Sequence, residues 1–206
     1  MTSPRGASPI ASSSPPRLVL ASESPRRKAL LAQAGIAPDA VHAAAIDESI
    51  HRHEQPRPYA LRLAAAKAHA VAQGWAKEPA LFLAADTVVA VGRRILPKAG
   101  SDEDVRACLT LLNGRAHRVL TAIAVLATDG KLRTRIVETR LIFCRLDARE
   151  IESYVRCGEG LGKAGGYAVQ GRAEIFVTHI SGSYSNVVGL PLRETISLLR
   201  GCGYPC

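Results

Sequence analysis

Residues 81–91 read Leu-Phe-Leu-Ala-Ala-Asp-Thr-Val-Val-Ala-Val, and this stretch decides the fold. Apart from Asp86, each residue in it is apolar or small, or is the β-branched Thr87, and the stretch contains no Pro or Gly. Such a run predicts a strand that is buried on both faces. A carboxylate in its middle is costly to bury unless a cation, a metal or several hydrogen-bond donors offset the charge. Asp86 is therefore either a cap for a neighbouring turn or part of a functional site.

The composition is that of a globular protein with a sizeable core. Hydrophobic residues make up 47% of the 206 residues but aromatic residues only 4%, so packing relies on aliphatic side chains and close helix contacts. The length suits one large domain or two small lobes. No apolar run reaches the roughly 18 residues of a membrane span. Residues 1–16 are rich in Ser and Pro and lack the apolar segment of a secretory signal, which predicts a disordered leader.

The charge and the cysteines of the chain indicate which partners it binds and in which cellular compartment it works. The five cysteines are scattered and form no Cys-x-x-Cys motif, which argues against a disulfide framework or a zinc site and favours a reducing cytoplasm. The formal net charge of +9 suits anionic partners such as nucleic acid, nucleotides or an acidic surface. The cations are spread along the chain without the interleaved aromatic residues of single-strand binders. Small phosphorylated ligands therefore fit at least as well as nucleic acid, and a merely soluble basic surface is the alternative.

The first strand and helix carry a local electrostatic conflict. The apolar run Arg17–Ser22 predicts a strand, and Ser24 followed by Pro25 is a strong helix start. A strand that leads into a helix N-terminus gathers free backbone N–H groups and the positive end of the helix dipole. Arg26 and Arg27 lie in that first turn and oppose the dipole unless an anion binds there. This conflict indicates a phosphate site, and two solvated arginines are the alternative.

The remaining pattern interleaves strands and helices. We expect helices at 56–73, 101–113, 147–158 and 191–201, the second and third opened by capping boxes. We expect strands at 43–48, 81–91, 173–180 and 184–188, an extended return at 92–98, and a hairpin of 117–127 with 132–143. The Asp129-Gly130 pair in that hairpin suits a type I′ turn. Residues 159–171 form a Gly-rich loop, and the whole indicates a mixed α/β sheet.

A few polar residues are candidates for one site, and the pattern leaves their roles open. Asp47-Glu48 ends a predicted strand, so only one of the two side chains would face a shared site. Lys67 lies on the buried stripe of its helix, where it either snorkels from the core edge or reaches into a cleft. Lys98 would lie across a hairpin from Asp86. The His51-Arg-His53 run has metal-ligand spacing, but its polar surroundings predict an exposed loop.

Five segments, in the same order, resemble signatures of the Maf nucleotide pyrophosphatases. They are Ala21–Leu31 with Ser-Glu-Ser-Pro-Arg-Arg, Ala85–Val89, Leu96–Lys98, Gly162–Gly171, and Gly182–Leu192. The similarity extends from about Leu18 to Leu199, so we expect one Maf-like domain over 17–206. The chain departs from the family in its long leader, in Ala99 where Pro is common, and in the Asp47-Glu48 pair, of which Glu48 aligns with the motif.

The resemblance implies a Maf/ITPase-like mixed sheet with flanking helices, in two lobes around a central cleft, often as a homodimer. It also implies hydrolysis of a nucleoside triphosphate to the monophosphate and pyrophosphate, with Mg²⁺ or Mn²⁺ assisting attack of water on the α-phosphorus. The Tyr-Ala-Val-Gln-Gly segment, which ends at Gly171, is similar to the branch that acts on dTTP and UTP. A preference for 7-methyl-GTP, a broader preference, and a non-catalytic nucleotide- or nucleic-acid-binding regulator of cell division are the alternatives.

The resemblance, read with the chemistry of the side chains, assigns roles to ten residues. Glu48 and Asp86 would hold the metal and form the catalytic pair, with Asp86 orienting or deprotonating the water. The phosphate cradle would consist of Ser22, Arg26, Arg27, Lys67, Lys98 and Lys163. Specificity would come from Arg26, Thr87 and Gln170, because an amide can pair with the adjacent donor and acceptor of a pyrimidine. We expect a cytoplasmic enzyme whose partner is the nucleotide, with no membrane and no nucleic acid.

Overall fold

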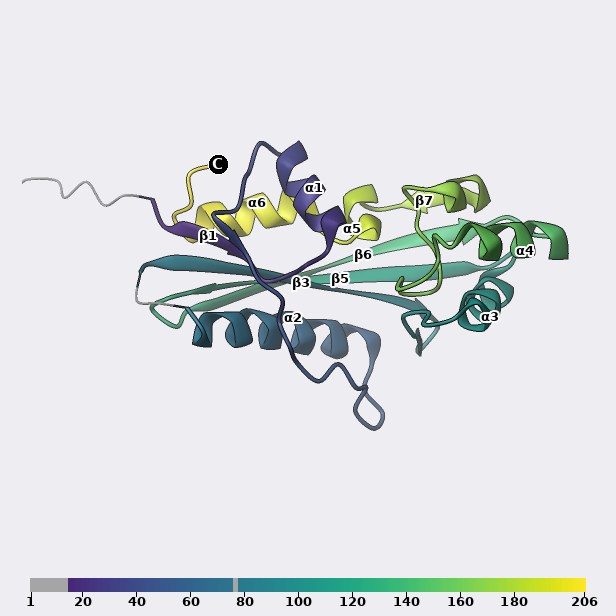
Figure 1. Ribbon diagram of the computed structural model, residues 1–206, viewed down its shortest axis with the longest axis horizontal. Coiled ribbons are helices and arrows are strands. Elements are labelled where there is room, and N and C mark those ends of the chain that lie inside the picture. Colours follow the sequence, from purple (N-terminus) through teal and green to yellow (C-terminus); the bar gives the residue numbers. More distant parts are fainter. Residues whose placement is uncertain (1–14, 76–77) are drawn as a thin grey trace, which may run out of the picture.

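Within residues 15–75 and 78–206, which are those that the computed structural model describes, seven strands form one sheet (Figure 1). The strands are β1 (Arg17–Leu20), β2 (Ala40–Val41), β3 (Ala80–Val91), β4 (Arg94–Leu96), β5 (Ala116–Ala127), β6 (Leu132–Phe143) and β7 (Val177–Ser181). Their order is β2-β1-β3-β5-β6-β7, with β4 also paired to β3. Strand β1 is parallel to β2 and β3, and the other pairs are antiparallel. The predicted mixed sheet is confirmed, and the division into two lobes stays a prediction.

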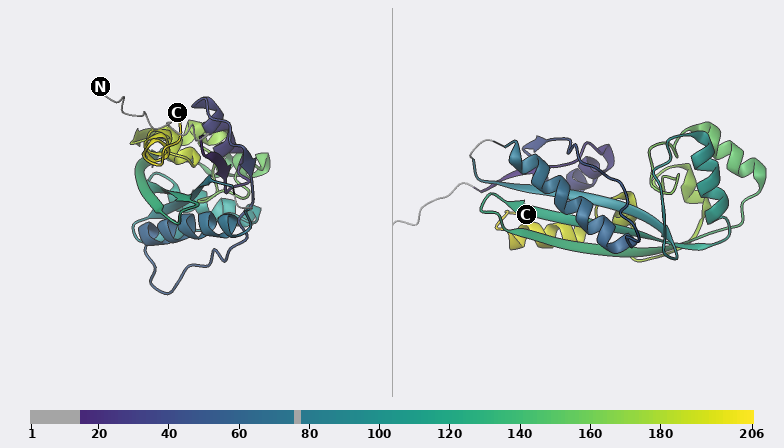
Figure 2. Two further views of the ribbon diagram at one scale, coloured as in Figure 1. Left: turned by 90° about the vertical axis from the view of Figure 1, so that its left-hand side faces the viewer. Right: turned by 90° about the horizontal axis from the view of Figure 1, so that it is seen from below.

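Helices cover both faces of this sheet. Helix α2 (Pro56–Gln73) lies on one face, and α1 (Pro25–Gln33), α5 (Tyr184–Val188) and α6 (Leu192–Gly201) lie on the other (Figure 1). Helices α3 (Asp102–Leu112) and α4 (Ala148–Cys157) pack at one end, as Figure 2 shows. Each face carries its own buried apolar cluster, and the one under α2 is built on Ala60, Ala64 and Ala68. These small side chains let the helix approach the sheet closely, as the composition predicts.

Strand β3 is central and has the burial that its sequence predicts, because every residue in it except Thr87 and Val91 is buried. One edge pairs with β5 along most of its length. The other edge pairs with β1 only up to Leu83 and with β4 only from Val89 onward. Residues 84–88 of this edge therefore have no partner strand among the described residues. The sheet has a gap at that point, and Asp86 lies beside it.

Most of the other predicted elements are confirmed. Helix α2 has the predicted bounds, and both capping boxes are present, with Ser101 opening α3 and Asp147 opening α4. The long hairpin of β5 and β6 is also as predicted. Helix α1 begins after Ser24 with Pro25 in its first turn, although the Ser24 side chain makes no capping hydrogen bond.

The expected strand at 43–48 is wrong. The backbone leaves the sheet after β2, where His42 N–H donates to the carbonyl of Leu20 (3.0 Å), and then crosses toward α2 without a strand partner. Its apolar alanines have another use, because Ala43 and Ala44 line a pocket. The expected type I′ turn is also wrong, since that turn needs positive φ at both central residues and only Gly130 has it (83°).

The expected strands at 173–180 and 184–188 are corrected in the same way. Residues Arg172–Phe176 form a short 3₁₀ helix, η1, and only 177–180 of the first range is strand. Residues 184–188 form helix α5, because the hydroxyl of Ser183 accepts the N–H of Asn186 (3.2 Å) and caps the turn. The adjacent valines favour a strand locally, but the tertiary contacts of Asn186 outweigh that preference.

The leader, the membrane spans and the cysteines are also subjects of sequence-based predictions. The predicted leader, 1–16, lies outside them except for its last two residues. In the described part of the chain, no helix has the length and apolar character needed to cross a membrane. All five cysteines are free thiols.

Candidate active site

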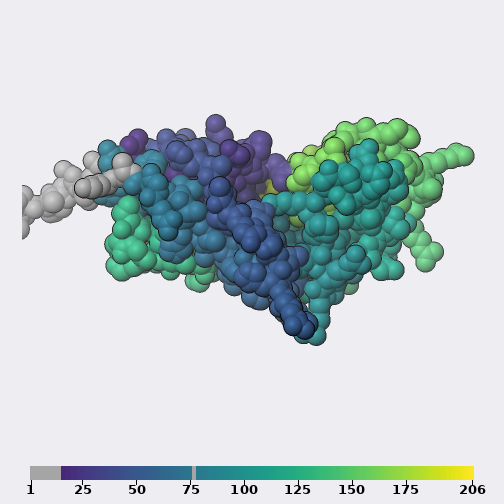
Figure 3. All heavy atoms as spheres, turned by 60° about the horizontal axis from the view of Figure 1, so that its bottom comes forward, coloured from purple at the N-terminus to yellow at the C-terminus, as the bar shows by residue number. Residues whose placement is uncertain are grey.

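A pocket of about 400 Å³ opens at the gap beside β3. Figure 3 shows the surface hollowed between the purple N-terminal segments and the green segments from later in the chain. Its wall is formed by the turn between β1 and α1, the free edge of β3, the segment after β4, the Gly-rich loop, α2 and α5. All ten residues that the sequence predicts for the site line it: Ser22, Arg26, Arg27, Glu48, Lys67, Asp86, Thr87, Lys98, Lys163 and Gln170. The structure thus brings them together, and their roles stay predictions.

Two carboxylates converge on one ammonium group at this pocket. Lys67 Nζ lies 2.6 Å from Asp86 Oδ1 and 2.7 Å from Glu48 Oε1. The second Glu48 oxygen pairs with Lys98 Nζ. Asp86 is only 3% exposed and sits in mid-strand, so it is no turn cap. Lys67 reaches into the pocket from α2, which decides between the two sequence-based interpretations of this lysine.

Glu48 is the acid of the Asp47-Glu48 pair that enters the pocket. Asp47 points outward and bonds to Ser49 instead. Burial raises the pKa of Glu48, but the hydrogen bonds and charges of Lys67 and Lys98 outweigh it and lower that pKa to about 2. Glu48 is therefore ionised at neutral pH.

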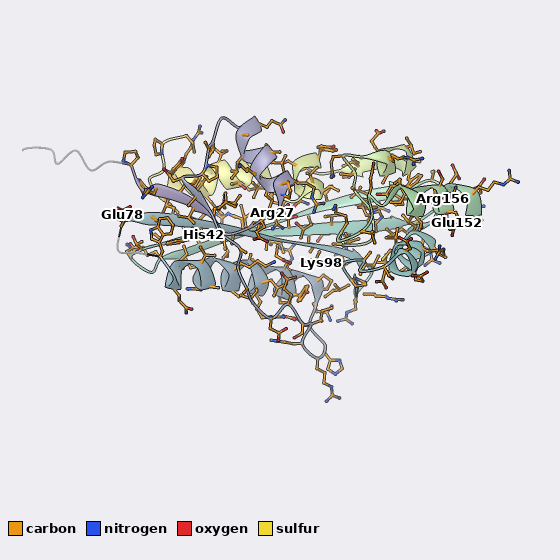
Figure 4. The ribbon with its side chains drawn as sticks, in the orientation of Figure 1. Arg27, His42, Glu78, Lys98, Glu152 and Arg156 are labelled. Atoms are coloured by element: carbon orange, nitrogen blue, oxygen red, sulfur yellow. The ribbon has the colours of Figure 1, made fainter. Side chains whose placement is uncertain are left out.

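The two adjacent arginines have different surroundings. Arg27 Nε donates to the carbonyl of Gly189 (2.8 Å), Nη1 to Ser22 Oγ (2.9 Å) and Nη2 to Thr87 Oγ1 (3.2 Å). It therefore ties the turn after β1 to β3 and α5, and Figure 4 shows it near the middle of the sheet. Arg26 has a buried Nε with no partner among the described residues, and burial lowers its pKa. An anion in the pocket would give Arg26 the partner that Arg27 already has.

The Lys98 segment and the Gly-rich loop are held together through their backbones. The N–H of Ala99 donates to the carbonyl of Lys163 (3.1 Å), and the N–H of Gly162 donates to the carbonyl of Ala99 (2.8 Å). A proline at position 99 would lack the first of these donors, so Ala99 leaves the link intact despite its departure from the family pattern. Burial, and then the charge of Arg26, lower the pKa of Lys163.

Sequence reasoning missed the residues that anchor the Gly-rich loop. Tyr167 lines the pocket, and its hydroxyl bonds to His117 Nε2 on β5 (2.8 Å). The hydroxyl of Tyr154 accepts the N–H of Ala168 (3.0 Å) from the same loop. No pattern in the sequence places these side chains together, because they come from three separate elements. Gln170, at the end of the loop, remains exposed at the pocket.

The lining has a net positive charge and a donor set that fits a divalent cation. Five cationic side chains face three carboxylates, those of Glu23, Glu48 and Asp86. No group of three or more His, Cys, Asp or Glu side chains within 15–75 and 78–206 is placed to hold a metal ion. Glu48 and Asp86 nevertheless converge on a single cation, that of Lys67. Two carboxylates completed by phosphate oxygens and water suit Mg²⁺ or Mn²⁺.

The exposed His51-Arg-His53 run does not join this site. Both histidines lie on the surface in a turn before α2. Among the described residues other than glycine, His53 alone has a positive φ (61°). The exposed loop that the sequence predicts is confirmed.

Comparison with known proteins finds one family model and several closely similar relatives. The family model described as "Maf-like protein" matches residues 17–202. A protein of Caulobacter vibrioides named dTTP/UTP pyrophosphatase is 58% identical over 190 residues, which are 92% of this chain and 97% of that protein. Proteins of the same name from Brucella abortus and Rhodopseudomonas palustris are 56% and 57% identical over 193 and 194 residues, covering 92% of this chain and 93% and 94% of theirs.

A solved structure offers a much weaker likeness. The nucleoside-triphosphatase / dITP/XTP pyrophosphatase of Mycobacterium abscessus has a TM-score of 0.41 and 16% identity, over 64% of this chain and 75% of that one, too low to bear on the activity. The family model and the closely related sequences, by contrast, span nearly the whole described chain. The chain therefore belongs to the Maf family.

Proposed function

We propose that this chain hydrolyses dTTP and UTP to the monophosphate and pyrophosphate. The observation that carries the proposal is the pair of carboxylates on Lys67 in a pocket lined by five cations. A site that only binds anions gains nothing from Glu48 and Asp86 beside its phosphates, whereas a hydrolase uses them. The names of the relatives support the choice of dTTP and UTP over 7-methyl-GTP.

The cations bind the triphosphate. Arg26, whose Nε has no partner among the described residues, and the lysines at 98 and 163 face the pocket and neutralise the phosphate charge. Ser22 and Arg27 bond to each other and fix the turn around the phosphates. The positive end of α1 adds to the same field.

Asp86 activates the water. Its Oδ1 accepts from Lys67, while Oδ2 has no partner within the described residues and is available to a water in the pocket. The water oxygen attacks the α-phosphorus, its proton passes to the Asp86 carboxylate, and the bond from the α-phosphorus to the bridging oxygen breaks. Pyrophosphate leaves with that oxygen, and the pocket cations stabilise its charge.

Glu48 and Asp86 are also the residues that would hold Mg²⁺ or Mn²⁺. A bound divalent ion would supply charge stabilisation for the phosphates at this position. Lys67 Nζ lies between the two carboxylates and compensates their charges.

Selection among bases is assigned to Arg26, Thr87 and Gln170. The exposed amide of Gln170 lies at the pocket and offers a donor and an acceptor side by side, which matches the edge of a pyrimidine. We further propose a single catalytic domain over 17–206 behind a leader, a cytoplasmic location, and a homodimer that analytical ultracentrifugation would detect.

The test measures pyrophosphate release from dTTP, UTP, CTP and 7-methyl-GTP, with Mg²⁺, with Mn²⁺ and with chelator. Wild type is compared with Asp86→Asn, and Asp47→Asn serves as the matched control because Asp47 lies outside the pocket. We expect metal-dependent release from dTTP and UTP that falls by orders of magnitude in Asp86→Asn and is unchanged in Asp47→Asn.

Other outcomes would revise the proposal in different ways. Release from 7-methyl-GTP alone would keep the reaction and overturn the role of Gln170. No release from any nucleotide by a folded protein would favour the binding-protein alternative. A near-normal rate in Asp86→Asn would remove Asp86 from the mechanism.

A further inference from the structure

A chain of hydrogen bonds leads from the pocket into the middle of the sheet. Arg27 Nη2 donates to Thr87 Oγ1 (3.2 Å), which lies 3.0 Å from Thr121 Oγ1. The hydroxyl of Thr121 donates in turn to the backbone carbonyl of Asn186 (2.9 Å). Thr87 lines the pocket, whereas Thr121, directly opposite it on β5, is fully buried. The chain thus links a residue that a ligand can touch to one that no ligand reaches.

The groups at its two ends fix the direction of each bond. A guanidinium only donates hydrogen bonds, and a carbonyl only accepts them. The single hydroxyl hydrogen of Thr121 goes to the carbonyl of Asn186, so toward Thr87 it can only accept. Thr87 therefore gives its own hydrogen to Thr121 and accepts from Arg27. No hydrogen of Thr87 is left for a ligand, and its hydroxyl presents only a lone pair to the pocket.

We propose that Thr121 is a positioning residue for base selection, because it takes the hydrogen of Thr87 and makes that hydroxyl an acceptor toward the bound nucleotide. The inference rests on the proposed function, since it concerns the same pocket. An acceptor-only oxygen repels ionised phosphate oxygens, so it faces a donor of the nucleotide. Uracil and thymine carry a donor at N3, the imide N–H, whereas cytosine has an acceptor there. Thr87 therefore accepts from the imide and disfavours cytosine.

The test compares kcat/KM for UTP and CTP in wild type, Thr121→Val and Thr121→Ser. Valine keeps the shape and removes the acceptor, so the hydrogen of Thr87 becomes free to donate to cytosine N3. We expect the preference for UTP over CTP to fall about fivefold in Thr121→Val, which corresponds to one neutral hydrogen bond. Thr121→Ser restores the wild-type preference because it keeps the hydroxyl.

The matched control is Thr195→Val in α6. Thr195 is also fully buried, and its hydroxyl also donates to a carbonyl, that of Pro191 (2.8 Å), away from Thr87. Thermal unfolding of each variant establishes that it is folded. A general loss of packing would lower the rates for both nucleotides in the two valine variants, whereas the proposal requires a changed ratio in Thr121→Val alone.

A second measurement uses the wild-type protein and does not depend on the folding of any variant. We expect N3-methyl-UTP, which lacks the imide hydrogen, to have a kcat/KM at least fivefold below that of UTP. Equal rates for the two, or an unchanged preference in folded Thr121→Val, would overturn the proposal. The proposal would also be overturned if kcat/KM fell with 3′-deoxy-UTP but not with N3-methyl-UTP, because that result would place a sugar hydroxyl, and not the imide, against Thr87. A wild-type protein that releases no pyrophosphate from UTP would instead refute the proposed function.

Discussion

Replacing Lys67 with Met tests the central ion pair of the pocket. Lys67 Nζ holds Asp86 Oδ1 at 2.6 Å, and the two side chains are only 9% and 5% exposed. Methionine has an unbranched apolar chain that follows the path of the lysine stem but carries no charge. The substitution therefore leaves the Asp86 carboxylate buried without its cation. We expect the variant to be less stable than the wild type.

The burial of the pair sets the expected size of the loss. Removing one partner of a buried ion pair costs about 3–5 kcal/mol, because the remaining charge is left uncompensated. Glu48, whose side chain is 33% exposed and which keeps its contact with Lys98, adds less than about 1 kcal/mol. In a domain of this size each kcal/mol lowers Tm by about 2–4 °C, so Tm falls by roughly 6–20 °C.

The assay is urea unfolding at pH 7 followed by circular dichroism, with chelator present because a divalent cation would replace the lost charge. The double variant Lys67→Met/Asp86→Asn carries neither charge, so we expect it to be more stable than Lys67→Met alone. Lys28→Met, on the exposed side of α1, is the control and stays within about 0.5 kcal/mol of wild type. The reasoning would be refuted if Lys67→Met unfolded at the same urea concentration as the wild type. It would also be refuted if the stability losses of Lys67→Met and Asp86→Asn simply added in the double variant.

Two further predictions concern the Gly-rich loop and the base. Burial lowers the pKa of His117 from 6.5 to about 4, so the unfolded chain binds a proton that the folded protein excludes as pH falls from 6.5 toward 4. The free energy of unfolding therefore drops by about 3 kcal/mol over that window. We expect His117→Gln to lose less stability than the wild type when urea unfolding is measured at pH 7, 5.5 and 4. A variant that loses as much stability as the wild type would contradict this prediction. Gln170→Glu replaces an amide with an acceptor-only carboxylate, so we expect a changed order of preference among dTTP, UTP and CTP, and an identical substrate profile would exclude Gln170 from base selection.

The parts of the fold that the sequence predicts well are those in which one local rule dominates. The β-branched run around Asp86 predicts β3 because it is buried on both faces. The Ser101 and Asp147 capping boxes predict helix starts because their side chains satisfy nearby N–H groups. Eight of the ten residues that line the pocket lie in the five family-like segments, whereas Glu48 and Lys67 lie outside them.

Tertiary contacts explain what the sequence does not predict. The valines before Gly189 favour a strand, yet the Asn186 side chain donates to the carbonyl of Val119 and to Thr139 Oγ1, and these buried bonds require the helical turn of α5. The difference between the two adjacent arginines is also invisible in the sequence, because it depends on the carbonyl of Gly189, just after α5 and distant along the chain.

The gap in the sheet explains how neighbouring residues of one strand come to serve one pocket. Consecutive side chains of a strand point to opposite faces, and Asp86 indeed meets Lys67 of α2 while Thr87 meets Arg27 of α1, on the other face (Figure 1). In a fully paired sheet, a ligand on one face would be separated from the other by the neighbouring strand. Because β1 ends opposite Leu83 and β4 begins opposite Val89, the edge between them is open and both side chains line the same pocket. The early end of β1 is therefore what allows the buried carboxylate of Asp86 on one face and the hydroxyl of Thr87 on the other to line a single pocket.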